Sequence, residues 1–122
     1  MRSLLASLIA LLATPALAVP VAQQAPGGPE QVIDDFQTDG MSDYRIDGTR
    51  GIYVLAAGNG RWYYLHVMPA CSRLAGADGF DVTTYGPDGR LDRDSVIRAQ
   101  GQVCHLSSVT ASPVPPGYKT LR

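Results

Sequence analysis

The two histidines, His66 and His105, are the only side chains in the sequence whose ordinary pKa lies near neutral pH, so a general base would be one of them. Hydrolysis by a serine needs a hydroxyl beside the imidazole and a carboxylate that orients the ring. On a strand, Ser107 would share a face with His105, and Asp94 or Asp81 would supply the carboxylate. No G-x-S-x-G elbow marks a nucleophile. A small periplasmic hydrolase using His105 with a nearby serine is therefore only the alternative function.

A cation site is a second kind of chemistry that the sequence suggests. Asp88, Asp92 and Asp94 follow one another closely and include Gly89 between them, and calcium is bound by several carboxylates at once. However, three residues separate the first two aspartates, so the D-x-D-x-D-G order of a binding loop is absent. Ordinary turn chemistry accounts for Asp88 and Gly89. We expect no metal here.

The chain has two cysteines, Cys71 and Cys104. In an oxidising compartment they would pair most simply with each other and close a loop of about 34 residues. Cys104, His105 and His66 could instead bind a metal ion, but neighbours on a strand point to opposite faces, and no C-x-x-C or H-x-x-x-H spacing is present. We expect a Cys71–Cys104 disulfide, with no metal and no cofactor.

Residues 1–18 have the order of a secretory signal peptide. Arg2 precedes an apolar stretch, Pro15 ends it, and Ala16-Leu17-Ala18 provides the small residues of a cleavage site. The apolar stretch of about 15 residues is shorter than the roughly 20 that a membrane-spanning helix needs. We expect cleavage after Ala18, a periplasmic or secreted protein, and no stable membrane span after cleavage.

The remaining chain divides by composition into three parts. Residues 19–30 are rich in proline and glycine and predict a flexible leader, residues 31–111 a β-rich domain, and residues 112–122 an extended C-terminal tail. Removal of Arg2 leaves nine basic and eleven acidic residues, without a basic stripe. Nucleic acid is therefore excluded as a partner.

The spacing of the apolar residues predicts the helices and strands that would position these side chains. Val32, Ile33 and Phe36 lie at helical spacing between Pro29 and Gly40, which predicts a short helix over residues 30–36. Alternation and turn signals then predict strands at residues 44–47, 51–57, 61–68, 80–85, 95–98 and 103–110. Turns are expected at residues 58–60, 86–89 and 101–102. The fold class is mainly β, a small antiparallel sandwich or partly closed barrel with one short N-terminal helix.

The same alternation predicts which side chains are buried. The expected core is Ile52, Val54, Tyr63, Leu65, Val67, Leu74, Phe80, Val82, Ile97, Cys104 and Leu106.

The opposite face of the strand at residues 61–68 is the candidate binding face and carries Trp62, Tyr64 and His66. If it is exposed beside Arg61 and Arg73, these rings would stack on a sugar or contact a protein chain. If a helix or a second sheet covers it, they belong to the core instead. Both possibilities remain open at this point.

Several motifs together resemble a known family. They are the aromatic strand WYYLHV, the segment Pro69-Ala70-Cys71-Ser72-Arg73-Leu74, an Asp-Gly turn, and the closing segment Cys104-His105-Leu106-Ser107-Ser108-Val109. Over residues 50–110 the chain resembles the DUF6491 family of small exported proteobacterial proteins of unknown function. Many of its members have a further cysteine upstream, where this chain has Asp34, Asp35 and Phe36. The resemblance implies export and a β fold, and it brings no activity.

These observations predict an exported, non-enzymatic envelope domain with a binding or structural role. Its partner would be a protein, a glycan or a small ligand.

Overall fold

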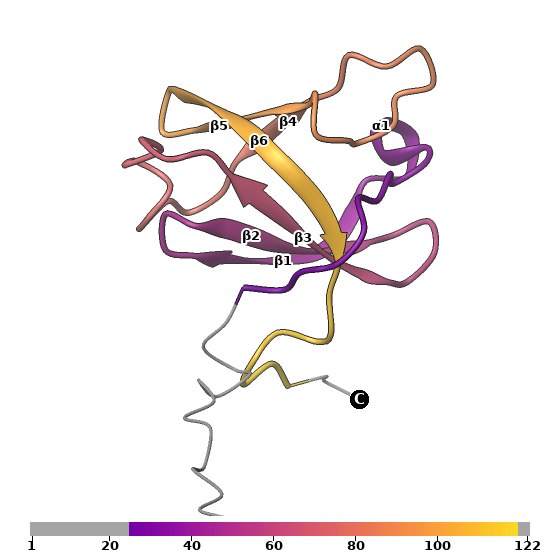
Figure 1. The fold of residues 1–122 in the computed structure, drawn as a ribbon, viewed down its shortest axis with the longest axis horizontal. Helices are drawn as coiled ribbons and strands as arrows, with labels where there is room; N and C mark the ends of the chain where they lie inside the picture. The colour runs from indigo at the N-terminus through magenta and orange to yellow at the C-terminus, as the bar shows by residue number, and fades with distance from the viewer. Residues whose placement is uncertain (1–24, 120–122) are drawn as a thin grey trace, which may run out of the picture.

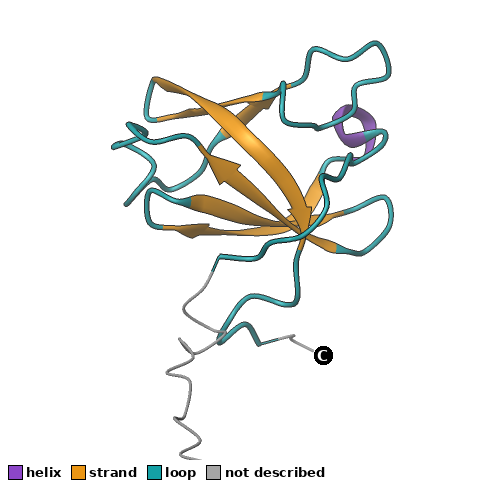
Figure 2. Cartoon of the chain, in the orientation of Figure 1, coloured by secondary structure: helices purple, strands orange, loops and turns teal. Residues whose placement is uncertain are grey.

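The computed structural model describes residues 25–119, so the expected signal peptide lies outside the described residues. The chain forms one antiparallel sheet of six strands in the order β1-β2-β3-β6-β5-β4, curled into a half-barrel (Figures 1 and 2). The elements are α1 (Phe36–Asp39), β1 (Met41–Asp47), β2 (Gly51–Ala56), β3 (Trp62–Val67), β4 (Asp81–Thr83), β5 (Val96–Ala99) and β6 (Gln102–Ala111). This confirms the mainly β class. Over the described range, no helix has the length and apolar character to cross a membrane.

Two meanders make up the half-barrel, β1-β2-β3 and β4-β5-β6, and they are joined where β3 pairs with β6. The β2–β3 hairpin turns at the expected Gly58-Asn59-Gly60, where Gly60 has φ 69°. The β5–β6 hairpin turns at Gln100 and Gly101, one residue earlier than expected. Both of these residues have positive φ, as a tight two-residue hairpin turn requires.

β6 is the longest strand because its two halves have different partners. Its first half pairs with β5, and its second half pairs with β3. Between them the register with β3 shifts, since His66 is opposite Ser108 while Val67 is opposite Leu106. Ser107 is the extra residue of this bulge, and a bulge bends a strand. The bend lets β6 cross from one meander to the other (Figure 1).

The core fills the concave side of the half-barrel and contains nine of the eleven expected residues as buried side chains. Phe80 and Val82 are partly buried instead, because β4 is the edge of the sheet. Ile33, Phe36 and Leu91 also belong to the core and were outside the sequence expectation. At the open side, Tyr44 and Phe80 meet edge to face with ring centroids 5.0 Å apart, which brings β1 and β4 together.

The N-terminal helix is not where the spacing of apolar residues places it. Glu30 forms a β-bridge with Thr110 and Ile33 forms one with Leu91, so residues 30–33 are extended rather than helical. The bridges use the backbone groups that a helix would need. The prediction of a helix over residues 30–36 is therefore wrong. A single helical turn, α1, begins instead at Phe36, whose ring is buried in the core.

Both flanking segments pack on the sheet. The Thr110 hydroxyl donates to the carbonyl of Pro26 (3.4 Å), and the backbone N–H of Val109 donates to Oε1 of Glu30 (3.1 Å). In the segment after β6, Pro115 is buried and Tyr118 packs on Trp62 with ring centroids 5.0 Å apart. The described parts of the expected leader and tail are thus folded, while residues 19–24 and 120–122 lie outside the described range.

The expected cysteine pair lies at bonding distance. The Cα atoms of Cys71 and Cys104 are 5.6 Å apart, and both side chains are buried. Cys71 follows β3 and Cys104 lies in β6, so the disulfide fastens the long connection after β3 to the central strand.

Candidate functional site

A polar cleft of about 390 Å³ lies between the segment that leads into and through α1 and the β2–β3 turn. Its volume falls within the roughly 300–1,000 Å³ of ordinary small-molecule sites. The charged and polar side chains that line it are Gln31, Asp34, Asp35, Asp39, Asn59, Arg61 and Tyr63.

Local backbone features place one wall of this cleft. The Ile33–Leu91 bridge fixes the chain just before Asp34. Asp35 adopts a left-handed conformation (φ 54°), which turns the chain into α1. At the end of α1, the Asp39 carboxylate lies over Gly58, where a Cβ atom would be 2.5 Å from its Oδ2. The acidic wall therefore approaches the opposite turn because Gly58 has no side chain.

The charged side chains of the cleft have no partner among the residues that the structure describes. Asp34, Asp35 and Asp39 form no side-chain hydrogen bond or ion pair with any of residues 25–119, and neither does the guanidinium of Arg61. Elsewhere the chain does pair such groups, as Arg50 does with Asp47 at 2.9 Å. The cleft thus combines unpaired carboxylates with one unpaired guanidinium.

Tyr63 brings a hydrogen-bond donor to the same place. Its side chain is 94% buried and its hydroxyl accepts from Nδ2 of Asn59 (2.9 Å). The oxygen and nitrogen of the Asn59 amide cannot be exchanged, because Oδ1 accepts the backbone N–H of Arg61 (2.9 Å). The phenolic proton of Tyr63 consequently has no acceptor in the described part of the chain, at a position that lines the cleft.

The chain matches no family model, no curated protein and no solved structure. The resemblance to the DUF6491 family therefore remains an expectation. What the cleft can bind has to follow from its own charges and hydrogen bonds.

The candidate binding face Trp62, Tyr64 and His66 is not the exposed surface that a docking role requires. Trp62 is 9% exposed and Tyr64 is fully buried, while His66 is partly buried. Trp62 and Tyr64 form a second buried cluster with Tyr53 on the convex side of the sheet, and Ala25, Leu55 and Tyr118 pack against it. Of the two possibilities that the sequence left open, the structure has the face covered, and the cover includes residues of the two flanking segments rather than a helix or a second sheet.

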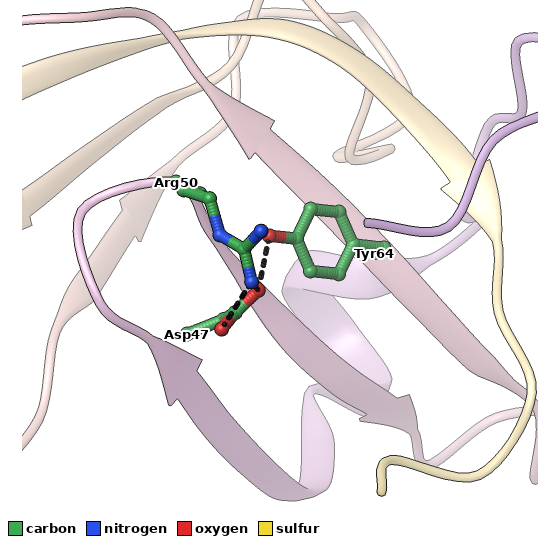
Figure 3. A network of polar contacts seen from close by, with 3 residues as sticks. All are labelled: Asp47, Arg50 and Tyr64. Carbon is green, nitrogen blue, oxygen red and sulfur yellow. Dashed lines mark hydrogen bonds and ion pairs between the residues drawn. The ribbon is translucent and has the colours of Figure 1, made fainter. Parts of the chain in front are cut away.

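Tyr64 is held in a polar network at the edge of that cluster (Figure 3). Its hydroxyl donates to Oδ2 of Asp47 (2.8 Å), which also receives a hydrogen bond from Arg50 (2.9 Å). The pKa of Tyr64 is raised by burial and by the bond to the Asp47 carboxylate, so the phenol stays neutral. Gly51 makes room for the ring, since a Cβ there would lie 2.5 Å from Cε1 of Tyr64. This network is structural, because it fixes the β1–β2 turn against β3.

His66 lies beside this network, beneath the N-terminal segment. Its Nε2 is 2.9 Å from the Thr110 hydroxyl, and its ring meets that of Tyr64 edge to face. Burial lowers the pKa of His66, while the nearby Glu30 carboxylate opposes this shift. The imidazole is thus used in packing.

The serine and histidine residues of the alternative hydrolase do not come together. The Ser107 hydroxyl donates to the carbonyl of His66 (3.3 Å), and Oγ of Ser95 accepts the backbone N–H of Asp92 (3.1 Å). His105 is exposed and makes no side-chain hydrogen bond with residues 25–119.

The aspartates considered for calcium serve the local backbone. The Asp92 carboxylate accepts the backbone N–H of Asp94 (3.0 Å) and lies 3.3 Å from Nε of Arg90. Gly89 closes the expected turn by donating to the carbonyl of Gly86. In the stretch from residue 25 to 119, no three His, Cys, Asp or Glu side chains are grouped closely enough to hold a metal.

The cleft residues were missed by sequence analysis, although one signal was present. That signal is the closeness of Asp34, Asp35 and Asp39 in the sequence. Arg61 appeared only as a neighbour of the candidate binding face. Nothing local to the sequence indicates that the β2–β3 turn faces these carboxylates.

Proposed function

We propose that this protein is an exported, non-enzymatic binding domain of the cell envelope that holds a small polar ligand in the cleft between α1 and the β2–β3 turn. The observation that carries the proposal is the set of unpaired charges, Asp34, Asp35, Asp39 and Arg61, around one concave space. Unpaired charges in a concave site favour a ligand of complementary charge, because both partners replace water with directed contacts.

Export is part of this proposal. It is supported by the signal-peptide order of residues 1–18 and by the Cys71–Cys104 pair, since disulfides persist in oxidising compartments. Membership of the DUF6491 family is proposed on the motifs around the same cysteines.

Intact-mass measurement of the exported protein tests the processing step. We expect the mass of residues 19–122, less the hydrogens lost to the disulfide. An exported species that keeps residues 1–18 would contradict cleavage after Ala18.

Binding is tested by thermal shift of the purified exported form with a panel of small amines, amino acids, amino sugars and organic acids. A ligand that binds the folded state raises the melting temperature in a concentration-dependent way. The matched variant combines Asp34→Asn with Arg61→Gln, and we expect it to lose the shift. A ligand that stabilises both proteins equally binds elsewhere and contradicts the cleft, and a panel with no active member contradicts the function.

A further inference from the structure

The two walls of the cleft carry opposite charge, and we infer that the ligand is a small zwitterion of net positive charge, the class of the basic amino acids. This inference rests on the proposed function and names the ligand class of the same site. It is carried by three features: the carboxylates of α1 and the segment before it, the guanidinium of Arg61, and the unused proton of Tyr63.

Tyr63 and Arg61 select the anionic end of the ligand. The Tyr63 hydroxyl already accepts from Asn59, so it can only donate further, and a guanidinium has donors alone. Tyr63 lines the cleft and only a small part of it is exposed, so an acceptor of the ligand in the cleft can receive its unused proton. A carboxylate accepts from both groups at once. An amine placed at this end would leave Tyr63 unsatisfied and would be repelled by Arg61.

The opposite wall selects positive charge. Asp34, Asp35 and Asp39 can only accept hydrogen bonds when ionised, and three negative charges lining one cleft attract a cation. One guanidinium, Arg61, cannot balance three carboxylates. A ligand with a single ammonium and a single carboxylate would leave the cleft negative. The three carboxylates and Arg61 give the cleft a net charge of −2, and a second ammonium or a guanidinium on the ligand reduces it to −1, which is the charge pattern of lysine or arginine.

A matched series of four ligands tests the class. L-lysine carries both ammonium groups and the carboxylate; cadaverine lacks the carboxylate, L-norleucine lacks the side-chain ammonium, and 6-aminohexanoate lacks the α-ammonium. Titration calorimetry on the exported form should give the tightest binding for L-lysine. We expect each deletion to weaken binding about tenfold or more, as the loss of a charge-assisted contact does.

Three variants test whether Arg61, Tyr63 and Asp35 determine these differences in affinity. Arg61→Gln and Tyr63→Phe should weaken L-lysine while leaving cadaverine nearly unchanged. Asp35→Asn, which keeps a residue tolerant of the left-handed conformation, should weaken both ligands. Arg93→Gln is the control, because Arg93 is exposed and lies outside the cleft. Melting temperatures show whether each variant is folded. If Tyr63→Phe does not fold, Arg61→Gln still tests the inference.

The outcomes separate this inference from the proposed function. The inference that the ligand is a zwitterion is overturned by either of two results. One is equal affinity for L-lysine and cadaverine, and the other is wild-type affinity for L-lysine in both Arg61→Gln and Tyr63→Phe. If none of the four ligands binds but another member of the wider panel does, the class is wrong and the binding function stands. If nothing binds in either experiment, both are overturned.

Discussion

At the scale of single residues, the tyrosines of β3 show how one side-chain type takes two roles. Tyr63 points to the concave core and reaches the cleft with its hydroxyl, while Tyr64 points to the convex cluster and bonds Asp47. Alternation along a strand predicts that they face opposite ways. Which hydroxyl keeps an unused proton depends on partners elsewhere in the chain, Asn59 and Asp47, and no local pattern reveals them.

Replacing Tyr64 by phenylalanine tests the network of Figure 3. The substitution keeps the ring over Gly51 and removes the bond to the Asp47 carboxylate. We expect the free energy of unfolding to fall by about 1–2 kcal/mol, the range for a hydrogen bond to a partly exposed charge. Urea denaturation of both proteins measures this difference. Tyr85→Phe is the control, since Tyr85 is 66% exposed, and equal losses in the two variants would contradict the network.

His66 predicts how stability depends on pH. Burial lowers its pKa in the folded protein, so folding favours the neutral ring. That stabilisation is fully present above the unfolded-state pKa of about 6.5 and is lost as the pH falls through the lower folded-state pKa. Between about pH 7 and pH 5, the wild-type unfolding free energy should therefore fall more steeply than that of His66→Gln. His105→Gln should keep the wild-type slope; if it instead behaves like His66→Gln, the assignment to His66 is wrong.

At the scale of elements, the strands follow from the sequence and the segments that flank them do not. All six expected strands exist, with β1 longer and β4 shorter than alternation predicts. Strand patterns are local, because each depends on apolar residues two positions apart. The segment at residues 30–33 pairs with the distant Leu91, so helical spacing predicts it wrongly. The segment around Tyr118 packs on the distant Trp62, and composition alone does not reveal this contact.

The fluorescence of Trp62, the single tryptophan of the chain, reports whether the segment after β6 packs on the sheet. Tyr118 covers its ring and donates a hydrogen bond to Oδ2 of Asp43 (2.5 Å). In Tyr118→Ala we expect Trp62 fluorescence to shift to longer wavelength as water reaches the indole. The unfolding free energy should also fall, because the aromatic pair with Trp62 is lost.

Val114→Ala provides the comparison within the same segment, because Val114 is 54% exposed. Its emission spectrum should match that of wild type. Identical spectra for wild type and Tyr118→Ala would show that this segment does not cover Trp62 in solution.

At the scale of the whole molecule, the Cys71–Cys104 bond supports a domain with a modest core. It closes a loop of about 34 residues, and on the chain-entropy model such a closure stabilises the fold by roughly 3–4 kcal/mol. We expect the double variant Cys71→Ser with Cys104→Ser to lose about that much in urea denaturation. Unfolding of the wild type with and without a reductant gives the same comparison without a mutation. A wild-type curve that does not respond to reduction would contradict a stabilising disulfide.

The place of β6 in the sheet also governs when the protein can fold during its synthesis. β6 is the last strand in the sequence and the one that joins the two meanders, since it pairs with β5 in its first half and with β3 in its second. A nascent chain that ends before Gln102 has the β1-β2-β3 meander and the β4–β5 pair but no strand between them, and it lacks Cys104. The six-stranded sheet and the disulfide therefore cannot form until Gln102 and the rest of β6 have been synthesised.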